Sequence, residues 1–233
     1  MNSLSQDMDN IYKDYYEKKG SSRNNPLNPE VFFQRFAGEM SFFQAMSSFP
    51  TNPQIAKVLD VGCGTGESLL NFLSLGFPLE NLHGIDILPE RIQIAQKRLP
   101  KCHIELGDAS KTIYDSDFFD IVYESTIFLQ MLDDSVAKSI ATEMTRVCKS
   151  GGHLVLTDWR YSHPWDNSYK GVSRKRLKTL FSDPSLKLER SFSGALVPPI
   201  GRFFSKHLSS LYFLIHKLFP FLVGQVTYVL KKS

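Results

Sequence analysis

The sequence has few cysteines, and they do not form a metal-binding pattern. Its three cysteines, Cys63, Cys102 and Cys148, are odd in number and lack the spacing of metal ligands, so we expect three reduced side chains and no metal site. Residues 1–20 hold seven charged side chains and no apolar core. We therefore expect neither a secretory signal nor an Arg-rich transit peptide, and by default a cytoplasmic location.

The sequence also lacks a long uninterrupted apolar run. Its most apolar and aromatic segment, residues 200–223, is interrupted by Lys217 and Pro220. A lysine near the middle of a bilayer costs about 2.5–3.5 kcal/mol, which argues against a transmembrane span. An interfacial helix or an apolar pocket for a substrate are the two interpretations that remain.

Acidic residues are scarce in the last third of the chain. Residues 1–158 contain 14 Lys and Arg against 21 Asp and Glu, whereas residues 159–233 contain 13 against 3. This asymmetry indicates an anionic substrate, a phosphate-bearing partner or an anionic membrane face, and a merely solvated surface is the alternative. The densest group of cations comprises Lys170, Arg174, Lys175, Arg176 and Lys178.

Short apolar runs alternate with amphipathic segments from residue 57 onward, which predicts strands alternating with helices. Predicted strands span residues 57–61, 81–87, 102–106, 119–125, 153–159, 186–193 and 223–232, and predicted helices span 67–75, 89–99, 135–149 and 173–181. This alternation predicts an α/β fold: a Rossmann-like, doubly wound, mostly parallel sheet whose last strand is antiparallel.

Two further segments complete the predicted organisation. Residues 1–50 form a helical lead-in, which we expect to act as a lid. It comprises a polar helix over residues 4–19, a loop over 20–29 and a helix over 30–48. Phe32, Phe36, Met40 and Phe43 recur every three or four residues, which predicts a buried helix face. Residues 51–233 form the main domain, with an apolar helical insertion at 200–222.

A glycine-rich turn follows the first predicted strand, in the stretch "VLDVGCGTGESLL". Gly62, Gly64 and Gly66 stand at alternate positions, where a ligand can approach the backbone closely. A dinucleotide fingerprint needs its third glycine at position 67, which is Glu67, and no Lys-Ser/Thr pair completes a phosphate loop. The turn therefore favours a nucleoside ligand with little phosphate and disfavours a nicotinamide oxidoreductase.

Five stretches in order resemble the class I S-adenosylmethionine-dependent methyltransferases. They are "VLDVGCGTG" (58–66), "LHGIDI" (82–87), "GDAS" (107–110), "FDIVYESTIFLQML" (119–132) and "RVCKSGGHLVLTDWR" (146–160). The resemblance implies that the cofactor is S-adenosyl-L-methionine, that the glycine turn lies beneath its methionine part, and that the reaction is methyl transfer.

The resemblance also implies roles for individual residues. Asp86 would accept from both ribose hydroxyls, Asp108 from the adenine amino group, and the Ala109 backbone would meet the ring. The alternatives are structural: Asp60 and Asp108 could stabilise turns, and Asp86 could cap the helix that begins at Pro89. The full set of expected cofactor-binding residues is Asp60, Gly62, Cys63, Gly64, Gly66, Asp86, Ile87, Asp108, Ala109 and Glu124.

The segments after the fourth and fifth predicted strands are the candidates for the acceptor side. Many members of the family have a histidine where this chain has Gln130, and a small residue where it has Glu124. We expect His163 to be the general base because its ordinary pKa is near neutrality, with a surface-loop histidine as the alternative. Glu124 is the second candidate base, or it holds the cofactor's ammonium group. Substrate candidates are Trp159, Arg160 and Tyr161.

These observations lead to a hypothesis about the acceptor. We expect a small molecule, either a saccharide or a lipid-linked anionic compound, methylated on oxygen, and a peripheral contact between the basic, apolar last third and the inner face of a membrane. A protein or nucleic-acid methyltransferase and a non-catalytic S-adenosylmethionine-binding module are the alternatives. Nucleic acid is disfavoured because "ESTI" stands where the Pro-rich amino-methylating signature would be.

Overall fold

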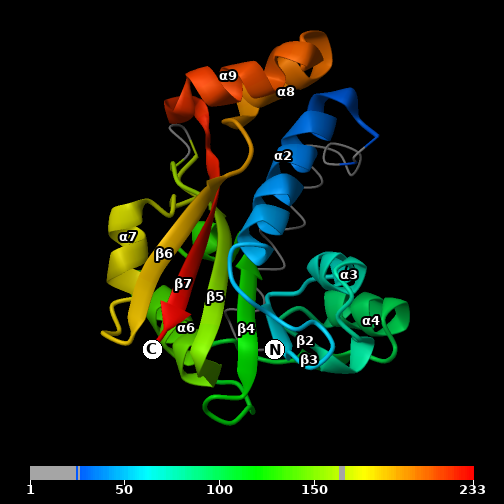
Figure 1. Cartoon of the computed structure of the whole chain (residues 1–233), viewed down its shortest axis with the longest axis vertical. Coiled ribbons are helices and arrows are strands. Elements are labelled where there is room, and N and C mark those ends of the chain that lie inside the picture. The colour runs from blue at the N-terminus through cyan, green and yellow to red at the C-terminus, as the bar shows by residue number, and fades with distance from the viewer. Residues whose placement is uncertain (1–24, 26, 163–165) are drawn as a thin grey trace. The chain divides into compact units, whose positions relative to one another are not determined.

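The computed structural model describes residues 25, 27–162 and 166–233, which form two compact units (Figure 1). The larger unit spans residues 47–191 and 228–233, and the smaller unit combines the described part of 1–46 with 192–227. The chain therefore passes through the smaller unit twice, a division that differs from the single boundary expected near residue 50. The role of residues 1–50 as a lid stays a prediction.

In the described part of the chain, seven strands form one sheet in the order β3-β2-β1-β4-β5-β7-β6. Strands β1 to β5 pair in parallel, and β7 runs antiparallel (Figure 1). The predicted fold class, a mostly parallel Rossmann-like sheet with an antiparallel last strand, is confirmed. The strands are β1 (Val58–Val61), β2 (Leu82–Asp86), β3 (His103–Leu106), β4 (Phe119–Ser125), β5 (Cys148–Trp159), β6 (Leu186–Ser193) and β7 (Gln225–Lys232).

The strand order reverses at β1. Val58 pairs with Leu82 of β2 on one side and with Ile121 of β4 on the other, and the chain reaches β2 and β3 before it crosses to β4. In open α/β sheets, ligands bind outside the carboxyl ends of the strands at such a switch point. The carboxyl ends of β1 and β4 are therefore where a ligand site is expected.

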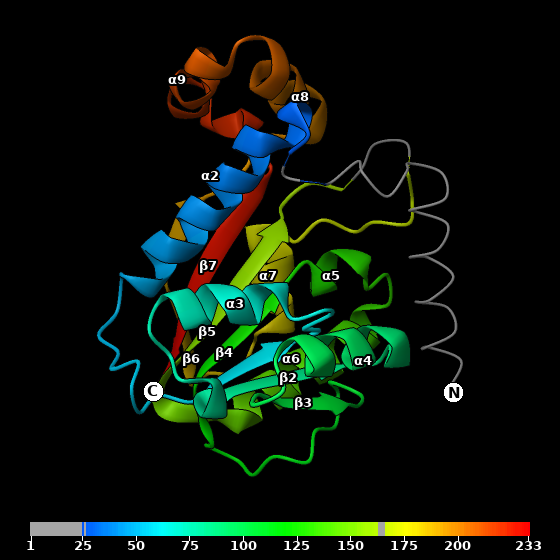
Figure 2. The same ribbon diagram turned by 90° about the vertical axis from the view of Figure 1, so that its right-hand side faces the viewer.

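Helices cover both faces of the sheet in the larger unit. Helices α3 and α4 lie on one face, whereas α6 and α7 lie on the other (Figures 1 and 2). Every residue of β1 and β2 is buried, as expected for parallel strands covered on both faces. The helices are α3 (Glu67–Ser74), α4 (Pro89–Arg98), α5 (Ile127–Gln130), α6 (Asp134–Val147) and α7 (Arg174–Leu180), with a 3-10 turn η2 (Leu79–Asn81).

One predicted helix end is wrong. The glycine pair Gly151 and Gly152 predicts a helix that stops at residue 149, but α6 ends at Val147 and β5 begins at once with the extended residue Cys148. Cys148 pairs with Phe119 of β4. Gly152 lies inside the strand, where a Cβ atom would come within 2.9 Å of the Asp120 carbonyl oxygen. The glycine therefore serves close strand packing.

The smaller unit is built on α2 (Pro29–Met46), against which α8 (Pro198–His207) packs closely. A Cβ atom on Gly201 would lie 2.4 Å from the Gln34 side chain, so a glycine is needed at this crossing. The Tyr212 hydroxyl donates to Gln34 Oε1 at 2.9 Å and accepts from the Leu196 backbone at 3.1 Å. The remaining elements are η3 (Ser209–Leu211), α9 (Tyr212–Leu218) and η4 (Pro220–Leu222).

The predicted buried face of α2 is wrong. Phe32 and Phe36 are about half exposed, at 52% and 46% of their surface. The buried face is instead offset by one residue and includes two polar side chains, Gln34 and Ser41. Both can be buried because each has a hydrogen-bond partner, Tyr212 for Gln34 and Thr227 for Ser41. The helix predicted over residues 4–19 lies outside the described part of the chain.

Candidate functional site

The glycine turn joins the end of β1 to the start of α3. All three glycines have positive φ angles, 66° at Gly62, 53° at Gly64 and 84° at Gly66, which other residues adopt at a cost. The backbone amides of Gly62 and Cys63 both donate to the Ile85 carbonyl oxygen, at 2.8 and 3.1 Å. The turn is therefore fixed to the end of β2 and exposes bare backbone at the switch point.

Space above the turn is limited by neighbouring side chains. A Cβ atom on Gly62 would lie 2.5 Å from Cδ1 of Ile127, the first residue of α5, and one on Gly66 would lie 2.9 Å from Leu99. At Gly64 the nearest atom would be Arg91 Nη1, at 3.1 Å. The glycines therefore form a cradle that any larger residue would fill.

Asp86 joins the turn to α4. Its Oδ2 accepts from the Gly64 backbone amide and its Oδ1 from the Leu88 backbone amide, each at 2.9 Å. The carboxylate is buried, and its oxygens have further lone pairs that could take ligand hydroxyls. Asp86 does not cap α4, because Leu88 is the N-cap residue and has no side-chain cap hydrogen bond; the bond to Gly64 makes Asp86 part of the turn.

Asp60 is a fully buried carboxyl group in β1. Burial is the main cause that raises its pKa well above the ordinary value, and the nearby Asp86 adds to it. Among the described residues, no group hydrogen-bonds to Asp60 Oδ2. A buried carboxyl oxygen without a partner is costly, and a cation or donor supplied by a ligand would compensate for that cost.

Glu124 and Asp158 form a second buried acidic pair, at the ends of β4 and β5. Both side chains are fully buried, and burial raises the pKa of both. The charge of Asp158 raises the pKa of Glu124 further. Glu124 Oε2 accepts from the Ile127 amide at 3.0 Å, while no described residue hydrogen-bonds to its Oε1. Asp158 accepts from the amides of Leu129 and Trp159, at 2.9 and 2.7 Å.

The short helix α5 is held by these acids and by Arg176 of α7. The buried guanidinium of Arg176 donates to the carbonyl oxygens of Phe128 and Met131, at 2.8 and 2.6 Å, and to Asp134 Oδ1 at 3.0 Å. Lys170 also binds Asp134, at 2.6 Å. Two of the five cations in the predicted basic cluster therefore support the segment beside the glycine turn and do not form an exposed anion-binding face.

The other predicted cofactor residues lie around the same strand ends. Ile87 follows β2 and is half-buried. The Cys63 thiol is buried, and burial raises its pKa, so it stays protonated at neutral pH. Asp108 Oδ1 accepts from the Ser110 amide at 2.8 Å, which is the turn-forming alternative, and Ala109 is half-buried beside it. Their contacts with a cofactor stay predictions.

The predicted acceptor-side residues follow β5. Trp159 and Arg160 are half-buried, Tyr161 is exposed, and the Arg160 guanidinium lies 4.7 Å from the centre of the Tyr161 ring. The Trp159 carbonyl oxygen accepts from the Val172 amide at 2.7 Å, which ties this segment to the residues before α7. His163 lies outside the described residues, so its role as general base stays a prediction.

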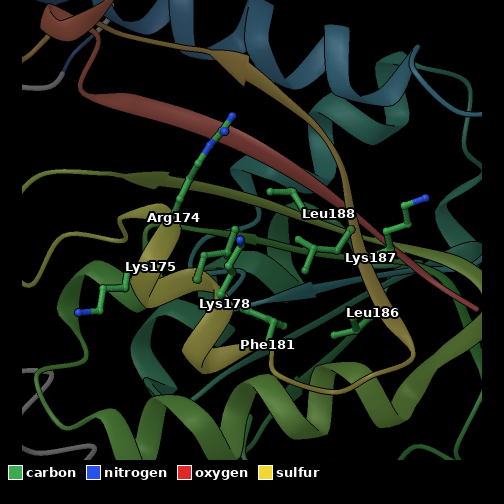
Figure 3. A pocket seen from close by; sticks show the side chains of 9 residues that line it. Arg174, Lys175, Lys178, Phe181, Leu186, Lys187 and Leu188 are labelled. Atoms are coloured by element: carbon green, nitrogen blue, oxygen red, sulfur yellow. The ribbon is translucent and has the colours of Figure 1, made fainter.

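A hollow of about 720 Å³ lies between α7 and β6, away from the residues that line the glycine turn. In Figure 3, Leu186 and Leu188 of β6 face Lys178 and Phe181 of α7, whereas Lys175 points away from β6. The hollow includes three cations of the predicted basic cluster. Its lining contains none of the residues that the sequence predicts for the cofactor or the acceptor. The lining residues are Arg174, Lys175, Leu177, Lys178, Phe181, Leu186, Lys187, Leu188 and Leu230.

Three residues of this arrangement are not predicted by the sequence. The sequence places Asp158 at the mouth where an acceptor would sit, but it does not predict the buried acidic pair with Glu124. Arg176 stands among exposed cations, and its sequence neighbours give no sign that it is buried. Ile127 is an ordinary apolar residue after a strand, and only the fold places it over Gly62.

Comparison with known proteins adds a family match. The family described as "Methyltransferase domain" matches residues 58–152, from the start of β1 into β5. This stretch contains the glycine turn and its neighbours Asp86, Asp108 and Glu124. The resemblance found in the sequence motifs is therefore confirmed.

Two curated relatives align with the same part of the chain. The 2-methyl-6-phytyl-1,4-hydroquinone methyltransferase of Synechocystis is 32% identical over 139 residues, which cover 57% of this chain and 42% of that protein. The phthiotriol/phenolphthiotriol dimycocerosates methyltransferase of Mycobacterium leprae is 31% identical over 126 residues, covering 53% of this chain and 45% of that protein. The chain thus spans less than half the length of each.

A solved structure extends the likeness to most of the fold. The geranyl diphosphate C-methyltransferase of Streptomyces coelicolor, solved with Mg²⁺, geranyl diphosphate and S-adenosyl-L-homocysteine, has a TM-score of 0.64 to this chain. The match covers 92% of this chain and 87% of that one at 15% identity, which shows a shared fold.

Proposed function

We propose that this chain, whose residues 58–152 match the methyltransferase domain family, is a class I S-adenosylmethionine-dependent methyltransferase that methylates a small lipid-linked acceptor. The observation that carries the proposal is the glycine cradle flanked by buried acids, Asp60 and Glu124, each with a carboxyl oxygen that no described residue binds. Members of this family transfer methyl groups to small molecules.

The residues of the site fit the cofactor. S-adenosyl-L-methionine carries a positive ammonium group and, when bound, supplies a methyl group on a positive sulfonium. Asp60 and Glu124 offer buried negative charge for those cations, and the bare backbone of Gly62 and Gly64 lets the ligand approach. Asp86 would take the ribose hydroxyls and Asp108 the adenine amino group, as the family resemblance implies.

We assign Glu124 to holding the cofactor and His163 to accepting the proton of the acceptor. Burial raises the pKa of Glu124, which favours its protonated form while no cation is bound beside it. A neighbouring cation would favour its ionised form. His163, three residues beyond Arg160, is the candidate base for a hydroxyl acceptor.

The acceptor is proposed from chemistry and from relatives. The relatives are named for a phytyl hydroquinone and for dimycocerosates, and the solved structure holds geranyl diphosphate. These names support an acceptor with a hydrocarbon chain more than they support a saccharide. Methylation on oxygen stays part of the same proposal, whereas the expected peripheral contact with a membrane face is a separate proposal. No helix in the described part of the chain is both long enough and apolar enough to span a membrane.

Calorimetric titration of the whole chain with S-adenosyl-L-methionine and with its demethylated product tests the cofactor. We expect binding that Asp86→Ala weakens by about tenfold or more, since a bond to a charged group contributes about 1.5–3 kcal/mol. Glu90→Ala, which removes an exposed acid at the start of α4, is the matched control. Glu124→Gln, which removes charge with little change in shape, replaces Asp86→Ala if that variant fails to fold.

This titration, together with an assay of methyl transfer to a set of acceptors, separates the alternatives. Absence of binding by the folded wild type would refute the proposal. Binding without turnover of any phenolic, prenylated or polyprenyl phosphate acceptor would favour a non-catalytic binding module. Turnover with a protein or nucleic acid and not with a small molecule would place the chain in the other enzyme class.

A further inference from the structure

The smaller unit exposes an unusual number of large apolar side chains on its last helical segments. They come from α8, η3, α9 and η4 and from the residues between them, and each is at least 39% exposed. We name this set the outer apolar surface. Its members are Phe203, Leu208, Leu211, Leu214, Leu218, Phe219 and Phe221.

The opposite faces of these helices are already occupied. Gly201 and Ser205 of α8 are buried against α2, and the Ser205 hydroxyl accepts from the Phe33 amide at 3.2 Å. In α9, Tyr212 is buried, and His216 Nε2 lies 2.8 Å from the Gly194 carbonyl oxygen. The outer apolar surface is therefore what remains after α8 and α9 have packed within their own unit.

The exposed residues share helix faces. Leu211, Leu214 and Leu218 are three and four residues apart, so they line one side of η3 and α9. Phe219 and Phe221 continue beyond α9 with their rings 5.9 Å apart. Contiguous exposed apolar surface of this kind marks an interaction site, since monomeric proteins seldom expose it.

The segment that carries this surface has charged side chains of one sign. Residues 192–227 contain Arg202, Lys206 and Lys217 and no Asp or Glu. Lys217 is exposed on α9 between Leu214 and Leu218. Arg202 and Lys206 both pair with Glu30 of α2, at 3.9 and 2.9 Å. Exposed apolar side chains with the cation of Lys217 among them are complementary to a surface that is apolar inside and anionic outside.

We infer that the outer apolar surface docks the smaller unit on an anionic lipid bilayer, with α8 and α9 lying in the interface. Apolar side chains enter the boundary between headgroups and acyl chains, while cations meet anionic headgroups. Helix α8 has ten residues and α9 has seven, so neither is long enough to cross a bilayer. This inference goes beyond methyl transfer and does not depend on cofactor binding.

A second copy of this chain is a less suitable partner. A two-fold contact through this surface would bring Lys217 of both copies together, and residues 192–227 offer no acid to pair with it. An anionic bilayer supplies the missing negative charge. Self-association is therefore an outcome that the test must detect.

The test is vesicle flotation of the whole chain, with a triple variant and a matched control. Leu214→Ser, Leu218→Ser and Phe221→Ser together remove three residues of the surface that are 50%, 59% and 63% exposed. The control, Ile55→Ser, Ile94→Ser and Ile113→Ser, removes residues of the larger unit that are 72%, 53% and 80% exposed. Vesicles contain phosphatidylcholine alone, or phosphatidylcholine with an equal part of phosphatidylglycerol.

We expect the wild type and the control to float with the anionic vesicles. We expect the triple variant to lose at least about tenfold in partitioning, because each buried Leu or Phe contributes substantially to transfer. Lys217→Gln should weaken binding to anionic vesicles and leave the weaker binding to neutral vesicles unchanged. Circular dichroism and cofactor titration, which should match the wild type, show that the triple variant is folded.

Three results would overturn the inference. One is a folded wild type that does not float with either vesicle, and another is a triple variant that floats as well as the control. The third is a wild type that sediments as a dimer, does not float, and becomes monomeric in the triple variant. If flotation fails while cofactor binding persists, the proposed function stands and only the membrane inference falls.

Discussion

The guanidinium of Arg176 donates a hydrogen bond of 2.8 Å to the carbonyl oxygen of Phe128, and so joins α7 to α5. Asp158 accepts from the next amide in α5, that of Leu129. A helix of four residues has too few internal hydrogen bonds to be stable alone, so its position depends on such partners. Since Ile127 of α5 covers Gly62, Arg176 supports the site from outside it.

Arg176→Ala should therefore destabilise the protein strongly. The carbonyl oxygens of Phe128 and Met131 would lose buried donors, and we expect a loss of about 3 kcal/mol in the free energy of unfolding. Urea denaturation measures this change.

Lys175→Ala is the matched control, because Lys175 is the adjacent, exposed cation of the same helix. We expect a change of about 0.5 kcal/mol or less. Equal effects of the two substitutions would contradict the supporting role assigned to Arg176.

The sequence predicts the strands well because their signal is local. Continuous apolar runs that end in Asp60, Asp86 and Asp158 define both the strands and the edge of the sheet where acids gather. Buried cations are not predictable in this way. Arg176 and Lys175 are adjacent in the sequence, and only the fold shows that Arg176 lies on the side of α7 that faces α5. The buried face of α2 is not predictable from apolar spacing either, since hydrogen bonds from Tyr212 and Thr227 let polar residues replace apolar ones there.

Gly62→Ala should reveal the closeness of α5 to the glycine turn. The φ angle of 66° costs about 1–2 kcal/mol for a residue with a Cβ atom, and that atom would lie 2.5 Å from Ile127 Cδ1. We expect a total loss of about 2–5 kcal/mol in the free energy of unfolding, measured by urea denaturation, since overpacking adds about 1–3 kcal/mol.

Gly151→Ala separates strain from contact. Gly151 has a φ angle of 83°, and a Cβ atom at this position would have no neighbour within 4 Å among the described residues, so only the backbone cost applies. In a chain that already carries Ile127→Ala, the cost of Gly62→Ala should fall close to the Gly151→Ala value. An undiminished cost in that background would argue against the contact.

The free energy of unfolding should fall as the pH rises, because Asp158 loses its proton. Burial raises the pKa of Asp158 to about 7 in the folded chain, above its ordinary value of about 3.9 when unfolded. Between these values the folded state holds a proton that the unfolded state has lost, so the free energy of unfolding falls by up to about 1.4 kcal/mol per pH unit. Below about pH 4 both states are protonated and this contribution is complete.

Urea denaturation at pH 5, 6 and 7 measures this slope. Asp158→Asn cannot titrate and should lose less stability than the wild type across that range, whatever its absolute stability. Glu124, the neighbouring buried acid whose pKa is also raised, should contribute in the same direction, so Glu124→Gln gives a second comparison on the same interacting pair. Parallel pH profiles for wild type and both variants would exclude a proton held by this pair.

Tyr212→Phe should loosen the smaller unit. The Tyr212 hydroxyl is buried, donates to Gln34 Oε1 and accepts from the Leu196 amide, so its removal leaves two buried polar groups unsatisfied at about 1–3 kcal/mol. Hydrogen exchange read by mass spectrometry should show faster exchange at Leu196 and across α9, with unchanged exchange in β1 and β4. Tyr161→Phe, at an exposed position in the larger unit, should leave the pattern unchanged. Faster exchange spread evenly over both units would mean that they unfold together, and that Tyr212 stabilises the whole chain and not only the helices that carry the outer apolar surface.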